Sequence, residues 1–292
     1  MDKVKKNLGV IFIILAACFW GSMGIFVRRL TGYGFDPIQI VALRVTVAAL
    51  IFSGILFFKE PKGFKIAPKD IVLFMGLGWG SILFFTICYF TAITIMPLST
   101  AAILLYTSPI WIMLMAAVVF REKITFKKLV ALILAFGGCV LVSGISGERI
   151  PLKGLALGLG SGLGYGLYSI LGTVALRKYS PYVVTAYTFL FAAAGSWVVC
   201  KPGEMIRILA KTESLAPLIL LCVLTGIITA VIPFLFYTLG LRSTDASKAG
   251  ILATIEPMVA TVIGVIAFNE ALTAFSAVGI VLILAASVIL SK

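Results

Sequence analysis

Residues 71–120, IVLFMGLGWGSILFFTICYFTAITIMPLSTAAILLYTSPIWIMLMAAVVF, run for 50 positions without a charged side chain. A helix needs only about 20 apolar residues to cross a bilayer, because the hydrocarbon core is about 30 Å thick. A single helix of this length would overshoot the membrane by a wide margin. The run therefore predicts two spanning helices joined by a tight turn at Met96-Pro97-Leu98-Ser99, with Ser99 or Thr100 capping the second helix.

The composition of the whole chain agrees with a membrane protein. Of its 292 residues, 61% are hydrophobic and 12% are charged, whereas a soluble domain averages about 45–50% apolar and about 25% charged residues. So many apolar residues cannot fit into a globular core of this size. We predict an all-α integral membrane protein with ten transmembrane helices, near 8–27, 37–58, 70–93, 99–119, 127–145, 154–176, 181–200, 215–240, 246–267 and 273–291.

The net charge of +13 comes from Lys and Arg in short clusters between the apolar runs. Clusters of this kind set topology and contact anionic lipid, so we expect membrane lipid as a partner and no nucleic acid. With both termini in the cytoplasm, 16 of the 24 Lys and Arg residues fall in inside segments and 7 in outside segments, while Arg44 lies within a span. The positive-inside bias therefore predicts cytoplasmic termini.

Several classes of chemistry lack their residues in this sequence. The chain has no histidine, and its five cysteines are scattered without a CxxC pair. The usual metal ligands and general base are thus missing, so we expect no metal, no cofactor and no enzymatic activity. There is also no GxxxxGK[ST] motif to bind ATP as a direct energy source.

The two halves of the chain resemble each other. Aligning residues 89–142 with 237–290 without a gap gives 12 identities in 54 positions, and it pairs Pro109 and Glu122 with Pro257 and Glu270. Five helices per unit return the chain to the opposite face, so the second unit must be inverted. We predict two five-helix repeats, 8–145 and 154–291, around a central cavity, an arrangement typical of carriers.

These features resemble a known family. Each half carries a Pro in its fourth helix followed by a run that ends in Glu: Ser108-Pro109 to Phe120-Arg121-Glu122, and Glu256-Pro257 to Phe268-Asn269-Glu270. With Trp20-Gly21-Ser22 and Phe136-Gly137-Gly138, the chain resembles the EamA-like branch of the drug/metabolite transporter superfamily. The resemblance implies a secondary carrier, often an exporter, of small metabolites across the bacterial inner membrane. It leaves the substrate open.

Two ionisable residues fall inside predicted spans, Arg44 in the second and Glu256 in the ninth. A charge at mid-membrane costs about 2.5–3.5 kcal/mol on insertion scales, so such residues are functional candidates by default. Glu256 would titrate during transport or bind a cationic group, and Arg44 would bind a carboxylate. The alternative is that each satisfies free backbone or a polar neighbour. The second half has Thr188 near the position of Arg44.

Polar and aromatic residues deep in the spans are the other candidates for the cavity wall. Such side chains stack on a ligand while donating one hydrogen bond, although Trp and Tyr also form belts at the membrane interface. The candidates are Trp20, Ser22, Tyr89, Tyr106, Ser108, Tyr165, Tyr168 and Tyr237.

A third group of residues is predicted to shape or gate the fold. Gly158, Gly162 and Gly166 recur every four residues and form a groove for close helix packing, or a site of bending. Pro109 and Pro257 interrupt their helices. Glu122 and Glu270 are interpreted as loop or cap residues, with a gating salt bridge to a loop cation as the alternative.

The sequence thus favours a transporter of small, amino-acid-like or related organic solutes that works by alternating access. A proton or a counter-substrate would supply the driving force. The alternative is a lipid-handling or assembly protein that moves no soluble solute. Substrate, direction, coupling and oligomeric state stay open at this point.

Overall fold

The computed structural model describes residues 2–144, 151–212 and 214–291, and all regular structure in them is helical. Ten helical segments of this part of the chain are long and apolar enough to cross a membrane. The predicted all-α, ten-helix membrane fold is therefore confirmed. Arg149 and Lys292, which enter the charge count, lie outside the described residues.

Several of the first five spans consist of more than one element. In chain order the elements are α1 (Asp2–Gly21) with α2 (Met23–Gly32); α3 (Pro37–Lys59); α4 (Ile71–Met75), the π-helical η3 (Gly76–Leu83) and α5 (Phe84–Ala92); α6 (Leu98–Leu105) with α7 (Ser108–Val119); and α8 (Phe126–Ser143). Two short 3-10 turns, η1 (Pro61–Phe64) and η2 (Pro68–Asp70), connect α3 to α4.

The last five spans follow the same plan. Their elements are α9 (Leu152–Leu176); α10 (Pro181–Val199); α12 (Leu215–Gly226), the π-helical η4 (Ile227–Val231) and α13 (Ile232–Leu241); α14 (Ala246–Ala253) with α15 (Ile255–Phe268); and α16 (Ala274–Ser291). A further helix, α11 (Pro202–Lys211), connects α10 to α12 and is outside the ten spans.

Two local expectations differ from the structure. The first span continues to Gly32, so Arg28 and Arg29 belong to the last turns of α2 rather than to a loop. Ser99 and Thr100 do not cap α6. Pro97 occupies the cap position in an extended conformation without a side-chain cap, and Ser99 already lies in the first turn.

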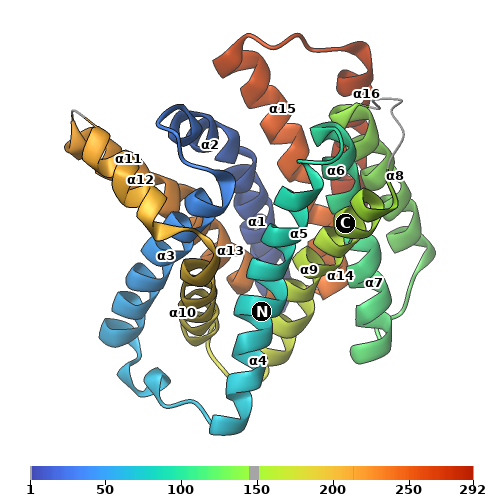
Figure 1. Ribbon diagram of the computed structural model, residues 1–292. Helices are drawn as coiled ribbons and strands as arrows, with labels where there is room; N and C mark the ends of the chain where they lie inside the picture. The colour runs from blue at the N-terminus through green and yellow to red at the C-terminus, as the bar shows by residue number, and fades with distance from the viewer. Residues whose placement is uncertain (1, 145–150, 213, 292) are drawn as a thin grey trace.

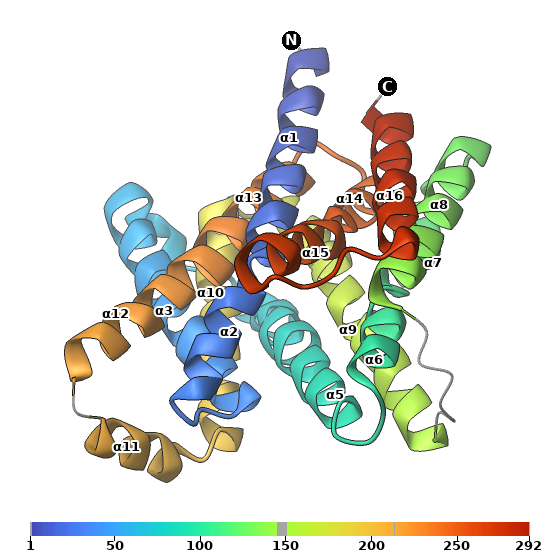
Figure 2. The same ribbon diagram turned by 90° about the horizontal axis from the view of Figure 1, so that it is seen from above.

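Helices of the two halves pack against each other in equivalent pairs. The first span, α1, packs on α13, α14 and α15, and the sixth span, α9, packs on α5, α6 and α7. Span two (α3) packs on span seven (α10), and span five (α8) packs on span ten (α16). Figures 1 and 2 show the α3–α10 pair and the α8–α16 pair on opposite sides of the molecule. The space between these pairs holds the cavity described below.

Glycine allows the α8–α16 pair to approach closely. A Cβ atom added to Gly138 would lie 2.7 Å from the carbonyl oxygen of Gly279, and one added to Gly279 would lie 2.7 Å from that of Gly138. Such reciprocal backbone contact is a common way for membrane helices to associate, because lipid provides little hydrophobic drive.

Candidate functional site

Three of the spans are interrupted, and a hydroxyl residue lies at each break. The breaks fall at Ser22, between α1 and α2; at Thr107, between α6 and α7; and at Thr254, between α14 and α15. Each hydroxyl donates to the carbonyl three residues earlier, at 2.7, 2.6 and 2.6 Å respectively. The hydroxyls thereby satisfy backbone groups that lipid would leave unpaired.

The two prolines predicted to interrupt helices lie just after two of these breaks. Pro109 and Pro257 occupy the first turn of α7 and of α15, and both are buried. Proline is tolerated at this position because its missing N–H would have no partner within the helix. The fourth and ninth spans therefore each contain a helix N-terminus. Its partial positive charge stabilises carbonyl or carboxylate groups nearby.

Glu256 lies in the first turn of α15, at the break in the ninth span. The hydroxyl of Tyr165, on α9, donates a hydrogen bond of 3.0 Å to its carboxylate. Gly21 of α1 packs against the Glu256 backbone, because a Cβ atom there would lie 2.8 Å from the Glu256 carbonyl oxygen. The carboxyl group of Glu256 is thus bound within the second half, while its backbone packs against α1 of the first half.

An aromatic cavity of about 20 Å³ adjoins this carboxyl group through Tyr165. It is large enough for about one water molecule. Spans one and three of the first half and spans six and eight of the second half supply its wall, which consists of Trp20, Ser81, Ile82, Phe85, Tyr165, Tyr168, Ser169, Phe234 and Tyr237. The cavity therefore lies between the halves.

Hydrogen bonds and ring contacts fix the cavity wall. The hydroxyls of Tyr168 and Thr238 lie 2.7 Å apart, as do those of Ser169 and Tyr237. The ring of Trp20 lies 5.2 Å from that of Tyr237 between centroids. These contacts hold the rings of α1, α9 and α13 in one orientation.

Arg44 reaches across from α3 to the second half. Its guanidinium donates to the carbonyl oxygen of Thr229 at 2.9 Å and contacts the sulfur of Met23 at 3.0 Å. Its Nε atom is buried and has no partner among the described residues. Arg44 is near enough to Glu256 for their charges to interact, but no direct ion pair joins them. One guanidinium donor is therefore free for another acceptor.

Both halves contain a π-helical segment in their third span, which the sequence did not predict. Residues 79–83 of η3 correspond to all of η4, residues 227–231, at the same offset of 148 that relates the Pro and Glu residues. A π-helical turn leaves carbonyls free and frequently marks a functional site. Thr229, whose carbonyl binds Arg44, corresponds to Ser81, whose buried hydroxyl has no described partner.

Of the predicted cavity residues, Trp20, Tyr165, Tyr168 and Tyr237 line the cavity. The other six do not: Glu256 adjoins the cavity only through Tyr165, and Arg44 contacts Thr229 and Met23 instead. Tyr89 packs with Ala92 and Met96, and Tyr106 packs with Cys139 and Ile255. Ser22 bonds to its own helix. Ser108 is buried beside Gly166 of the glycine groove.

Five further wall residues escaped the sequence analysis: Ser81, Ile82, Phe85, Ser169 and Phe234. Most are ordinary residues for a membrane helix, so their type gives no signal. The run Gly76-Leu77-Gly78-Trp79-Gly80 before Ser81 was the one local hint, because closely spaced glycines weaken a helix.

The glycine groove of α9 receives the interrupted fourth span. A Cβ atom at Gly158 would lie 2.4 Å from Leu104, and one at Gly162 would lie 2.6 Å from the Thr107 hydroxyl at the break. One at Gly166 would lie 3.1 Å from Ile112. The groove therefore holds the break of span four against span six.

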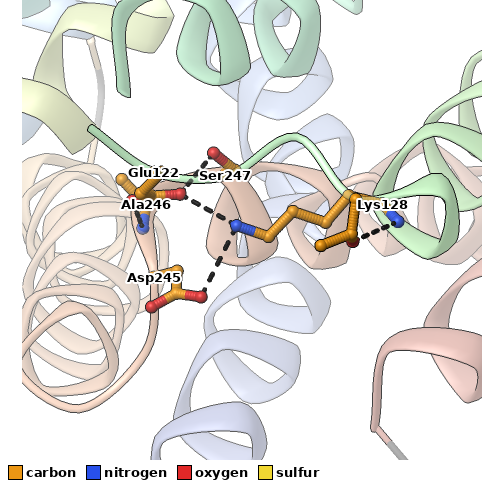
Figure 3. Close-up of polar contacts among 6 residues, drawn as sticks. Glu122, Lys128, Asp245, Ala246 and Ser247 are labelled. Carbon is orange, nitrogen blue, oxygen red and sulfur yellow. Dashed lines mark hydrogen bonds and ion pairs between the residues drawn. The ribbon is translucent and has the colours of Figure 1, made fainter. Parts of the chain in front are cut away.

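Glu122 and Glu270 follow α7 and α15, and these helices end at opposite edges of the molecule in Figure 1. Glu122 accepts hydrogen bonds from the backbone N–H of Ala246 (3.1 Å) and the hydroxyl of Ser247 (2.6 Å), both at the start of α14. The Lys128 ammonium lies 3.0 Å from Glu122 and 3.5 Å from Asp245 (Figure 3). Glu122 thus binds the N-terminus of a helix in the other half.

Glu270 makes a different contact. Arg28 of α2 binds its carboxylate at 2.5 Å and stacks over the ring of Phe268 at 4.1 Å. Both charged side chains are about half exposed, Arg28 at 55% and Glu270 at 47%, whereas Lys128 and Glu122 are exposed at 12% and 14%. The duplicated glutamates therefore have different surroundings.

Comparison with known proteins identifies the relatives of this chain. It is 27% identical to an uncharacterized transporter of Archaeoglobus fulgidus, over 94% of this chain and 92% of the relative. It is also 27% identical to the threonine/homoserine exporter RhtA of Escherichia coli, over 85% of this chain and 79% of that protein. A solved crystal structure, 19% identical, shares the fold with a TM-score of 0.78 and covers 96% of this chain and 95% of its own.

The model of the EamA-like transporter family matches residues 7–144 and again residues 152–292. Together the two matches include nearly the whole chain. The protein is thus a multi-pass membrane transporter that belongs to the EamA-like family of the drug/metabolite transporter superfamily.

Proposed function

We propose that this transporter is a secondary carrier that exports small amino-acid-like solutes by alternating access. The observation that carries the proposal is the Tyr165–Glu256 hydrogen bond at the wall of an aromatic cavity between the halves. A carboxyl group inside a membrane span, next to a cavity, is costly and therefore functional by default.

The two ionisable residues match the two ends of an amino acid. Glu256 offers a carboxylate for an ammonium group, and Arg44 has a buried Nε donor without a partner among the described residues, which suits a carboxylate. The aromatic rings of the cavity wall suit a short apolar side chain. RhtA, a relative with 27% identity, is named as a threonine/homoserine exporter, and this supports the same class of solute.

The pattern of helix contacts supports two inverted repeats, residues 8–145 and 154–291. Spans one and six make equivalent contacts in the opposite half, and each repeat has an odd number of spans. Inverted repeats around one site suit alternating access, because exchanging the conformations of the repeats exchanges the open side. The charge bias favours cytoplasmic termini in a bacterial inner membrane.

Export against a gradient requires a coupled process, and the sequence contains no motif that would bind ATP as the energy source. A proton or a counter-substrate would serve. Glu256 is the group we propose to accept either a proton or the ammonium of the solute, so that one event excludes the other. Competition at Glu256 would couple proton movement to solute movement without a second binding site.

The test is efflux from proteoliposomes loaded with a panel of radiolabelled amino acids that includes threonine and homoserine. We expect efflux of a subset of the panel, and a loss of about tenfold or more in the Glu256→Gln variant, because a neutral amide forms a weaker bond with a cation. Glu204→Gln is the matched control, since Glu204 lies on α11 outside the spans. Its efflux should equal that of the wild type.

Other results would contradict the proposal. No solute-specific efflux, together with movement of labelled lipid between leaflets, would favour the lipid-handling alternative. Equal efflux from Glu256→Gln and wild-type protein would remove Glu256 from the mechanism. A pH dependence of efflux that survives Glu256→Gln would assign proton coupling to another group.

A further inference from the structure

The loops that carry Glu122 and Glu270 have the same backbone. Arg121 and Asn269 precede the glutamates, and each adopts a left-handed conformation with a φ of 55°. The Glu122 N–H donates to Ala116 (3.3 Å), and the Glu270 N–H donates to Gly264 (3.1 Å). All of these pairs are related by the offset of 148. The two carboxylates therefore project from equivalent places.

The helix that receives Glu122 has an equivalent in the first half. Glu122 binds the start of α14 at Ala246 and Ser247. The offset of 148 relates these positions to Leu98 and Ser99 at the start of α6. Ser247 and Ser99 are the same residue type, so α6 offers the same hydroxyl and the same kind of N-terminal amide to a carboxylate.

Within the described part of the chain, Glu270 makes no hydrogen bond to the start of α6. It binds Arg28 at the surface instead of α6. Ser247 is buried at 1% exposure under Glu122, whereas Ser99 is half-buried. Of the two equivalent contacts, the one between Glu122 and α14 is therefore formed, and the one between Glu270 and α6 is not.

We infer that Glu122 and Glu270 are alternating latches: Glu122 closes its end of the carrier on α14 in the state seen here, and Glu270 closes the opposite end on Ser99 of α6 in the other state. The inference rests on the proposed alternating access. When Glu270 leaves Arg28 for α6, Glu122 leaves Ser247. Each latch joins a loop of one repeat to the interrupted span of the other repeat. Opening or closing one end of the carrier therefore moves that interrupted span.

The two latches differ in strength. The position of Lys128 corresponds to Ser276, and that of Asp245 corresponds to Pro97, so the Glu270 latch lacks the buried ammonium of the Glu122 latch. Charge-assisted hydrogen bonds are roughly twice as strong as neutral ones. The resting carrier therefore favours the state with the Glu122 end closed, as in this structure.

The experiment measures distances across both ends by electron–electron double resonance in lipid nanodiscs. One pair of spin labels replaces Lys123 and Arg242 at the Glu122 end, and another replaces Ile95 and Leu272 at the Glu270 end. All four side chains are exposed. The native cysteines are replaced by alanine, and efflux is checked in this background.

We expect Glu122→Gln to shift the populations by about tenfold toward a longer distance at its own end and a shorter one at the other. Glu270→Gln should act in the opposite direction. Ser99→Ala, which keeps both carboxylates and alters only a half-buried hydroxyl, should act like Glu270→Gln. Opposite shifts of this kind are not expected from residues that only stabilise the fold.

Two results would overturn the inference, and they are distinguishable. If both ends move but the glutamate variants shift them in the same direction or leave them unchanged, the latches are wrong while alternating access stands. If neither end shows a second distance under any variant or with substrate, alternating access fails as well.

Discussion

The loops at the Glu122 end and the Glu270 end of this transporter have the same backbone conformation, but their glutamates make different contacts. Glu122 is nearly buried and binds a serine hydroxyl, a backbone N–H and an ammonium group from across the repeat boundary. Glu270 is half exposed and binds only Arg28 among the described residues. A duplicated sequence thus produces equivalent local structure with different tertiary contacts, a difference that we attribute to the conformational state.

The energies of the two ends should differ as well. Exposed ion pairs contribute about 0–1 kcal/mol, because solvent screens the charges and two side chains lose freedom. Breaking a buried pair by removing one partner costs about 3–5 kcal/mol, because the other charge stays desolvated. Nearly all of the electrostatic stabilisation that holds an end closed should therefore come from the contacts of Glu122.

The largest effect is expected from Glu122→Ala. The variant leaves the ammonium of Lys128 with only Asp245 and leaves the Ser247 hydroxyl without its acceptor. We expect a loss of about 3 kcal/mol in the free energy of unfolding, measured by denaturant titration in detergent. Glu270→Ala is the matched control. A loss in the control as large as in Glu122→Ala would contradict the comparison.

A smaller effect is expected from Ser276→Lys, which makes the two ends more alike. Ser276 occupies the position of Lys128, and both residues donate their N–H to a threonine three residues earlier, Thr273 and Thr125. The new ammonium should favour the closed Glu270 end by about 0.5–1 kcal/mol. The Ile95–Leu272 distance should shorten. An unchanged or longer distance would show that the latches are not equivalent.

The smallest effect is expected from Arg28→Ala. It removes an exposed ion pair and a cation–π contact with Phe268, which together should change the free energy of unfolding by about 0.5–1 kcal/mol. The measurement is the same denaturant titration, with Arg29→Ala as control because Arg29 is an exposed neighbour. A loss above that of Glu122→Ala would reverse the assignment of the closed end.

Much of the fold follows from the sequence because lipid allows few solutions. Apolar length fixes the ten spans, and the Pro and Glu repeats at a constant offset reveal the duplication. The cavity was harder to predict. Trp20 and Tyr165 could be proposed from residue type, but Phe85 and Phe234 look like any lipid-facing phenylalanine until their neighbours are known.

Some site features could not be predicted at all. The π-helical segments η3 and η4 were not predicted, because their residues are ordinary for a membrane helix. We infer that the choice of partner for Glu122 and Glu270 depends on the conformational state, and identical sequence positions cannot encode which of two states is populated. Of the cations beside them, Lys128 has no equivalent in the other half, where Ser276 occupies its position, whereas Arg177 lies over Phe120 as Arg28 lies over Phe268.

The most direct test of the central claim, that only one end is latched at a time, is hydrogen–deuterium exchange of two peptides in the unlabelled carrier. One spans the start of α14 and contains the Ala246 N–H bound by Glu122; the other spans the start of α6 and contains the equivalent N–H of Leu98. The account predicts slow exchange at Ala246 and fast exchange at Leu98 in wild-type protein, and the reverse order in Glu122→Gln. Equal protection at both positions, or loss of protection at Ala246 without any gain at Leu98, would contradict it.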